Sequence, residues 1–378
     1  VTVQIEASGT FQSAGRGQPD RPLRILFITR KWPPALGGME TYAAELTRAL
    51  KDQGHEVDLI ALPGKPDGCA PGALAISAFG LGTGLRLLAR RGDWDAVHGG
   101  DMAIWPLVRL AAVRCRRTPV LSLSAHGTDV SFAAQASTTG WLYRRYLGLA
   151  LRAFPEQPPR IAANSDATAE RLHRLGFKAT RTIPLGCRVP EPTLKEETPE
   201  ELLFAGRLVA RKGLSWFVQS VLPNLPEHIR LAVCGTRWDA SEDATLDDPR
   251  VTFEGPLPQD ALWERMSKAL AVIVPNRHSG THQFEGFGLV AAEAAASGGL
   301  VLAARLDGFT TSVVDGETGT LLPPEDAAAR TDAIRDLAAL DTSERAARRR
   351  QAADAARRHF AWDRVAAQTA DMLRGTEG

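Results

Sequence analysis

The sequence predicts an α/β protein built from two Rossmann-like domains, in which parallel strands alternate with helices. The chain has 378 residues, which is more than one hydrophobic core ordinarily holds. Two series of short apolar runs, each followed by helical patterns, lie on either side of the charged, Pro-rich residues 190–199. We therefore expect a tail over residues 1–22, a first domain over 23–190, a second over 191–355 and a closing helical segment over 356–378.

Composition sets the limits on location and partners. The chain has 24% charged residues and a net charge of +1, so its charge does not indicate binding to nucleic acid. The cysteines are scattered without metal-ligand spacing and no apolar run is long enough to span a bilayer, which predicts a cytoplasmic protein with reduced thiols. The first twenty residues are polar and lack the apolar core of a signal peptide, so we expect a disordered or vector-derived tail.

The first domain opens with a β–α–β pattern. Residues 23–29 predict a buried strand, 41–54 a helix and 55–62 a second strand. The glycine fingerprint of dinucleotide-binding folds is absent, and Gly37-Gly38 stands just before the helix instead. A plain loop explains this pair, and so does the close approach of a ligand to the backbone.

Polar residues mark both ends of later strands in this domain. Asp93 and Asp95 form a metal-binding type of triplet but precede a strand, which favours a capping role. His126 and Asp129 follow the predicted strand 120–124, at the end where open α/β sheets bind ligands. A structural role remains open for His126.

Residues 141–154 predict an amphipathic helix that mixes arginines with aromatic and leucine side chains. Such a helix packs on a core or lies at a membrane surface, and the sequence leaves both alternatives open.

The second domain repeats the pattern. Strands are expected over 201–208, 230–235 and 251–255, and a strand–loop–helix–strand unit over 271–301. Arg207 and Lys212 lie where a strand gives way to a helix; two cations there oppose the helix dipole unless they pair with an acid or bind an anion.

The 271–301 unit carries two acids and a glycine-rich turn. Glu285 precedes a helix expected over 287–297, and Glu293 lies inside it. The two acids are either a dipole partner and a solvated helix residue, or a pair that binds sugar hydroxyls beside the exposed N–H groups of Gly286, Phe287 and Gly288.

These motifs together resemble the retaining GT-B glycosyltransferases of the large group 1, or family 4, type, which includes bacterial mannosyl- and glucosyltransferases. The resemblance rests on Glu285-Gly286-Phe287-Gly288 with Glu293, on Gly37-Gly38, on His126-Gly127 and on the Gly-Arg-Leu…Lys-Gly element that contains Arg207 and Lys212. It covers nearly the whole chain. It implies a GT-B fold whose two Rossmann-like domains face each other across a cleft, with a C-terminal helix that returns from near residue 360 to the N-terminal domain. The first domain would bind the acceptor and the second the nucleotide sugar.

The resemblance also implies roles for single residues. His126, Glu285, Arg207 and Lys212 would be catalytic, and Asp129 would lie on the acceptor side. The donor would be bound by Gly37, Gly38, Arg207, Lys212, Gly286, Phe287, Gly288, Leu289 and Glu293. Two stretches depart from the family pattern: Leu185-Gly186-Cys187-Arg188 replaces Asn-Gly-Val-Asp, and the loop 276–283 has its own composition.

We therefore expect a retaining hexosyltransferase that uses a UDP-sugar or GDP-mannose and needs no metal or other cofactor. Its acceptor would be a hydroxyl of a glycan, a lipid-linked sugar or a small molecule, as in polysaccharide or glycolipid synthesis, and the enzyme would act in the cytoplasm or at the inner face of the membrane. A GT-B nucleotide-sugar epimerase and a non-catalytic nucleotide-sugar-binding protein are the alternatives.

Overall fold

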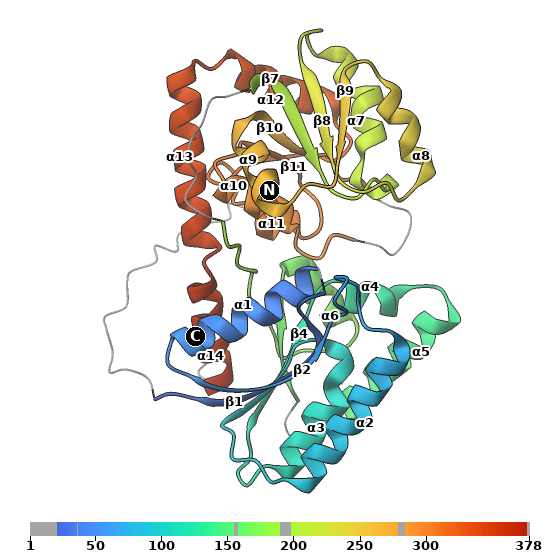
Figure 1. The fold of residues 1–378 in the computed structure, drawn as a ribbon, viewed down its shortest axis with the longest axis vertical. Helices are drawn as coiled ribbons and strands as arrows, with labels where there is room; N and C mark the ends of the chain where they lie inside the picture. Colours follow the sequence, from blue (N-terminus) through green and yellow to red (C-terminus); the bar gives the residue numbers. More distant parts are fainter. Residues whose placement is uncertain (1–20, 36, 155–157, 190–197, 279–283, 376–378) are drawn as a thin grey trace, which may run out of the picture.

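The computed structural model describes residues 21–35, 37–154, 158–189, 198–278 and 284–375. Most of the expected tail and linker, and residues 279–283 of the loop before Glu285, lie outside these described residues. Two six-stranded parallel sheets form the frame of the molecule, which confirms the predicted fold class (Figure 1).

The first sheet has the strand order β2-β1-β3-β4-β5-β6. Ile25 and Phe27 of β1 pack with α1, whereas Leu26 and Ile28 pack with α3 and α5 on the other face, so β1 is apolar throughout because both its faces are covered. The strands are β1 (Arg24–Trp32), β2 (Glu56–Pro63), β3 (Ala96–Gly99), β4 (Val120–Ala125), β5 (Arg160–Ala163) and β6 (Thr180–Thr182). The helices are α1 (Gly38–Asp52), α2 (Ala73–Ala89), α3 (Trp105–Arg114), α4 (Thr128–Ala134), α5 (Thr138–Ala153) and α6 (Asp166–Arg174).

The second sheet has the order β12-β11-β10-β7-β8-β9. Helices α7 and α12 pack on one face, and α9, α10 and α13 on the other. The strands are β7 (Thr198–Ala205), β8 (Arg230–Cys234), β9 (Val251–Gly255), β10 (Ala269–Val274), β11 (Val301–Ala304) and β12 (Thr320–Leu322). The helices are α7 (Leu214–Ser220), α8 (Ala240–Asp243), α9 (Gln259–Lys268), α10 (Leu289–Ala296), α11 (Phe309–Ser312), α12 (Ala327–Ala339) and α13 (Thr342–His359).

The last helix, α14 (Trp362–Arg374), lies against α1 of the first domain, as expected (Figure 1). Arg160 Nη1 donates to the carbonyl of Met372 at 2.6 Å, and Gln53 Nε2 donates to that of Asp363 at 2.7 Å. Because α13 packs on α10, the α13–α14 segment connects the two domains along one side of the molecule.

Two local predictions differ from the structure. The helix expected from residue 287 begins at Leu289, because Gly288 takes a left-handed φ of 87° and a Cβ there would lie 2.3 Å from the Phe309 ring. Helix α2 was not predicted from the sequence, because its three glycines weaken its helical pattern. Among the described residues, no helix is long and apolar enough to cross a membrane.

Candidate active site

The two sheets turn the carboxyl ends of their strands toward each other, and glycines lie where the two domains meet. A Cβ on Gly127, after β4, would lie 2.5 Å from the Cα of Gly286, and a Cβ on Gly38 would lie 3.4 Å from Leu289 Cδ1. Four of the predicted motif positions therefore meet across the domain boundary. Only residues without a side chain allow that approach at the Gly127–Gly286 contact.

Glu285 forms the central ion pair of the site. Its Oε2 lies 2.6 Å from Lys212 Nζ and 2.9 Å from Arg211 Nη1. Burial alone would raise the pKa of Glu285, but Lys212 and Arg211 lower it to about 2. The glutamate is therefore a carboxylate at neutral pH, held between two cations. Arg211 was not predicted from the sequence; its place beside Lys212 was the available signal.

The loops after β7 and β10 fix these cations. Ala210–Lys212 form a 3₁₀ turn that ends at Gly213, whose φ is 74°. A Cβ at Gly213 would lie 2.1 Å from the carbonyl oxygen of Pro275, so the turn packs directly on the chain that follows β10. Neighbouring parallel strands thus place Lys212 beside Glu285 although 73 residues separate them.

Arg207 occupies a different position from the one its predicted partnership with Lys212 implies. Its guanidinium lies 5.3 Å from the ring centre of Trp238, and its side chain is exposed. The cation next to Lys212 at Glu285 is Arg211. Arg207 lies at the rim of the same loop, where it remains available to a ligand.

A further set of contacts holds the backbone at Glu285. Asp307 Oδ2 accepts the N–H of Glu285 at 3.3 Å, and Asp307 Oδ1 lies 3.4 Å from Arg171 Nη2 of α6. The Arg171 guanidinium also lies 3.7 Å from the centre of the Phe284 ring. An arginine of the first domain therefore supports the loop of the second domain that carries Glu285.

Glu293 lies half-buried in α10, where Gln259 Nε2 donates to its carboxylate at 3.1 Å. Burial raises the pKa of Glu293 to about 7, and the Gln259 hydrogen bond offsets part of that rise. The two glutamates thus differ: Glu285 is stabilised as a carboxylate by two cations, whereas no cation of the described residues pairs with Glu293.

His126 follows β4 and is buried. Its Nε2 lies 3.0 Å from the carbonyl oxygen of Gly100, which only accepts, so Nε2 carries the proton and Nδ1 is an acceptor. The Tyr42 ring packs edge-on at 4.5 Å. Burial lowers the pKa of His126 to about 4, so the ring is neutral at neutral pH.

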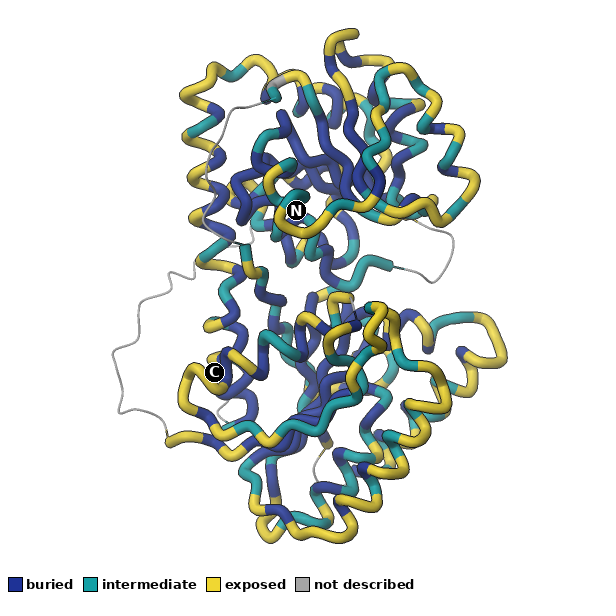
Figure 2. Tube along the Cα trace, viewed as in Figure 1, coloured by how far each residue is buried: buried dark blue, intermediate teal, exposed yellow. Residues whose placement is uncertain are grey.

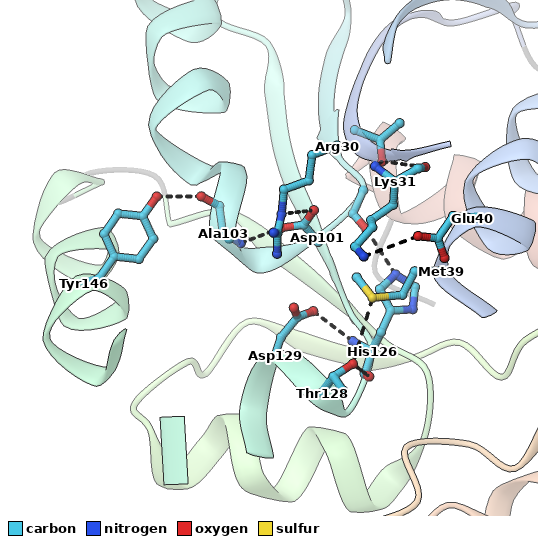
Figure 3. Close-up of polar contacts among 12 residues, drawn as sticks. Arg30, Lys31, Met39, Glu40, Asp101, Ala103, His126, Thr128, Asp129 and Tyr146 are labelled. Atoms are coloured by element: carbon cyan, nitrogen blue, oxygen red, sulfur yellow. Dashed lines mark hydrogen bonds and ion pairs between the residues drawn. The ribbon is translucent and has the colours of Figure 1, made fainter. Parts of the chain in front are cut away.

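Asp129 belongs to a charged cluster on the first-domain side of the site (Figure 3). Its Oδ2 accepts the N–H of His126 at 3.2 Å, while the fully buried Asp101 pairs with Arg30 Nε at 3.0 Å. Burial and the charge of Asp101 raise the pKa of Asp129 to about 7. Lys31 and Glu40 form a further pair at 3.3 Å nearby. Of this cluster only Asp129 was predicted from the sequence, because the other members come from β1, the loop after β3 and α1.

The remaining predicted features lie apart from these contacts. Asp95 Oδ2 accepts the Arg24 N–H at 2.8 Å at the entrance of β3, away from the carboxyl ends of the strands. Gly186, in the stretch that departs from the family pattern, packs against Trp362, and the Cys187 N–H donates to the Phe360 carbonyl at 2.9 Å. Among the described residues, no group of three or more His, Cys, Asp or Glu is arranged to hold a metal ion.

Comparison with known sequences identifies relatives over both domains. A glycogen synthase of Mycobacterium tuberculosis H37Rv is 27% identical over 404 residues, covering 93% of this chain and 94% of that protein. A phosphatidyl-myo-inositol mannosyltransferase of Mycolicibacterium smegmatis is also 27% identical, covering 77% of this chain and 78% of that protein. A D-inositol 3-phosphate glycosyltransferase of Xylanimonas cellulosilytica is 36% identical, but over only 45% of this chain and 41% of that protein.

Solved structures share the fold. Sucrose-phosphate synthase from Thermosynechococcus elongatus superposes with a TM-score of 0.69 at 21% identity, covering 93% of this chain and 98% of that one. Anabaena HepE in complex with UDP-glucose superposes with a TM-score of 0.62 at 17% identity, covering 94% of this chain and 100% of that one.

Family models agree with the motifs. The model described as Glycosyltransferase Family 4 matches residues 36–189, and the one described as Glycosyl transferases group 1 matches residues 199–339. These matches confirm the resemblance inferred from the sequence: the chain belongs to the group 1 glycosyltransferases of family 4.

Proposed function

We propose that this glycosyltransferase moves a hexosyl unit from a nucleotide sugar to an acceptor hydroxyl, with retention of anomeric configuration and without a metal ion. The observation that carries the proposal is the Glu285–Lys212–Arg211 ion pair, which lies just before α10 and close to His126-Gly127 of the other domain. It combines cations that suit a diphosphate with a carboxylate that suits sugar hydroxyls. The UDP and UDP-glucose complexes of Anabaena HepE, which has the same fold, support a nucleotide-sugar donor.

In this proposal the cations stabilise the leaving group. Lys212, Arg211 and the exposed Arg207 would bind the donor diphosphate, helped by the N–H groups that point out of the start of α10. When the bond between the anomeric carbon and the diphosphate oxygen breaks, negative charge develops on that oxygen. Fixed positive groups at such a place typically contribute about 10²–10³ in rate each, and they replace a metal ion in this role.

The glutamates and His126 would position the donor. Glu285 would bind hydroxyls of the transferring sugar, and His126 would accept a sugar O–H at Nδ1, which its neutral tautomer leaves unprotonated. Glu293 would bind the ribose. The acceptor hydroxyl would attack the anomeric carbon from the Asp129 side, and its proton would pass to the departing diphosphate oxygen on the same face.

Product analysis with a panel of nucleotide sugars tests the proposal. One UDP- or GDP-sugar should raise the thermal unfolding midpoint and yield free nucleoside diphosphate plus a glycosylated acceptor, with or without chelator. Conversion of the donor alone into an isomer would identify an epimerase. Activity lost with chelator and restored by Mn²⁺ or Mg²⁺ would contradict metal independence.

Lys212→Ala connects that activity to the site. Loss of a charged hydrogen bond to the diphosphate should weaken nucleoside diphosphate binding by about 10- to 100-fold in calorimetry. Lys268→Ala is a matched control, because Lys268 pairs with Glu264 on α9. Equal affinities in both variants would show that Lys212 does not bind the diphosphate.

A further inference from the structure

Apolar side chains are exposed mainly on one side of the first domain. Among the described residues, the large hydrophobic side chains with high exposure are Leu74, Leu81, Leu85, Leu88, Val113, Phe132, Trp141, Leu142, Leu149 and Trp238. All except Trp238 belong to α2, α3, α4 or α5. Soluble proteins seldom gather exposed apolar groups in this way, so this side of the domain is a candidate interaction surface.

Helix α2 contributes four of these side chains, more than any other helix. It has 17 residues and no acidic ones, yet only Thr83 and Leu87 are buried. Leu74 is 85% exposed, Leu81 69% and Leu85 59%. Burying a leucine side chain typically stabilises a protein or complex by about 1.5–3 kcal/mol. The exposed leucines of α2 do not gain this stabilisation in the isolated chain.

Three helices form the surface together. Figure 1 shows α2, α3 and α5 along the outer side of the first sheet, whose other face is covered by α1 and α14. Figure 2 shows exposed segments in yellow along α2 and α5. We call this surface, made of α2, α3 and α5, the outer helical face.

The charged side chains of α2, α3 and α5 on the outer helical face are all positive. Helices α2, α3 and α5 contain no aspartate or glutamate. Exposed arginines are interspersed with the leucines and Trp141; on these helices and the loops that follow α2 and α3 they are Arg86, Arg90, Arg91, Arg116, Arg117, Arg144, Arg145 and Arg152.

Two cavities on this face have basic linings. One, of about 460 Å³, lies between the end of α3 and the start of β4 and is lined by Arg109, Arg116 and Arg117. The other, of about 200 Å³, lies on α5 beside Trp141, with Arg144, Arg145 and Arg152. Both could take an anionic headgroup, because guanidinium groups bind phosphate oxygens well.

The exposed apolar side chains and the arginines of the outer helical face together fit one partner, an anionic lipid bilayer. Exposed leucines and a tryptophan between arginines are what a peripheral helix needs at an anionic bilayer: the apolar groups enter the interface while the arginines bind lipid phosphates. A second copy of this chain would place arginines against arginines across a symmetric interface, which is unfavourable.

We propose that the outer helical face docks on an anionic lipid bilayer, with α2 as the inserted helix, and that the acceptor of the proposed transfer is carried by a lipid. The second part rests on the proposed function. The inner side of α5 supports it, since Tyr146 Oη donates to the Ala103 carbonyl at 2.5 Å and so connects α5 to the loop that carries Asp101 (Figure 3). Docking would bring the bilayer next to the Asp129 side of the site.

Vesicle co-sedimentation tests the docking. The full chain should pellet with phosphatidylcholine vesicles that contain phosphatidylglycerol and stay in solution with pure phosphatidylcholine, and added salt should release it. The double variant Arg86→Glu/Arg145→Glu should lower the affinity for anionic vesicles about tenfold or more. Arg350→Glu/Arg358→Glu, an equal charge change on exposed positions of α13, should bind like the wild type.

Leu81→Ser/Leu85→Ser isolates the apolar contribution, because it removes two exposed leucine side chains without adding a charge. Both positions are exposed, so the fold should persist while vesicle binding falls at all salt concentrations. Equal binding to neutral and anionic vesicles, or no loss in the arginine variant relative to its α13 control, would overturn the proposal. So would a wild-type chain that ignores vesicles and forms a dimer in sedimentation velocity that the Leu81/Leu85 variant abolishes.

Transfer assays separate this inference from the proposed function. On a water-soluble acceptor, the arginine and leucine variants should keep wild-type turnover, whereas on an acceptor embedded in anionic vesicles they should lose about tenfold or more. Turnover without vesicle binding would contradict only the docking inference. Vesicle binding without turnover of any nucleotide sugar would contradict only the proposed function and the lipid acceptor that rests on it.

Discussion

At the scale of single residues, the two glutamates experience opposite electrostatic environments. Lys212 and Arg211 stabilise the charged form of Glu285 against the cost of burial, whereas Glu293 accepts a hydrogen bond from the neutral Gln259. A contact at the transferring sugar changes as the bond breaks, while a contact at the ribose is made alike in ground and transition states. Their substitutions should therefore differ in kinetics and in pH dependence.

Steady-state kinetics checks the first difference. Glu293→Gln should mainly raise the donor KM, whereas Glu285→Gln should lower kcat by about 10²-fold. Nucleoside diphosphate affinity of Glu285→Gln, measured by calorimetry, should not fall, because Lys212 and Arg211 lose a competing carboxylate. A Glu285→Gln enzyme with full kcat would show that the carboxylate is structural.

Thermal unfolding against pH checks the second difference. The pKa of Glu293 is raised from 4.5 to about 7, so the folded state binds its proton more tightly and becomes less stable as pH rises through that range. The unfolding midpoint of Glu293→Gln, relative to wild type, should therefore increase between about pH 5 and pH 8.5. The pKa of Glu285 is lowered to about 2, so Glu285 titrates below this pH window. The difference in unfolding midpoint between Glu285→Gln and the wild type should therefore stay constant across the window. A flat Glu293→Gln difference would contradict the raised pKa.

At the scale of elements, α6 of the first domain takes part in the site of the second. Arg171 contacts both Phe284 and Asp307, and Asp307 in turn accepts the Glu285 N–H. The backbone position of Glu285 therefore depends on how the two domains meet.

Arg171→Ala should lower kcat more than it changes nucleoside diphosphate affinity, because it loosens Glu285 while leaving Lys212 in place. We expect a loss of about tenfold, as for a moderate misplacement of a catalytic group. Arg174→Ala is the matched control: it lies one turn further along α6 and makes an exposed pair with Glu170. Equal kinetics in the two variants would argue that α6 does not position Glu285.

At the scale of the whole molecule, one apolar cluster extends through both domains. It includes Leu46 of α1, Val365 of α14, Phe360 between α13 and α14, and Ala292 of α10. Trp362 is central to it, since a Cβ on Gly186 would lie 2.6 Å from the Trp362 ring and the Tyr42 ring lies 6.2 Å away. The α13–α14 segment thus joins the domains by packing as well as by chain connection.

Trp362→Ala should lower the thermal unfolding midpoint by on the order of 10 °C, because emptying a buried aromatic site costs about 3–5 kcal/mol. Calorimetry or fluorescence measures the unfolding midpoint of this variant against that of the wild type. Trp238→Ala removes a side chain that is 70% exposed and should shift the midpoint little. Similar shifts in both variants would show that α14 contributes little to the stability of the folded chain.

The sequence by itself determined the fold class, the order of the motifs and the family. These properties depend on local patterns: strands buried on both faces are apolar throughout, helices show their own period, and glycine pairs mark places where a ligand or another group approaches the backbone. Glu285, Lys212, His126 and the glycine pairs were found from such patterns together with the resemblance to the family, and the structure brings them to the facing ends of the two sheets.

Only the tertiary structure decided which side chains are partners. Arg211 and Glu285 are 74 residues apart, and Arg30 and Asp101 are 71 apart, so no local period relates them. Sheet order places their loops side by side, and a 3₁₀ turn points Arg211 at Glu285 while Arg207 lies over Trp238. The exposure of α2 is also a tertiary property, because an apolar helix looks the same in sequence whether a sheet covers it or not.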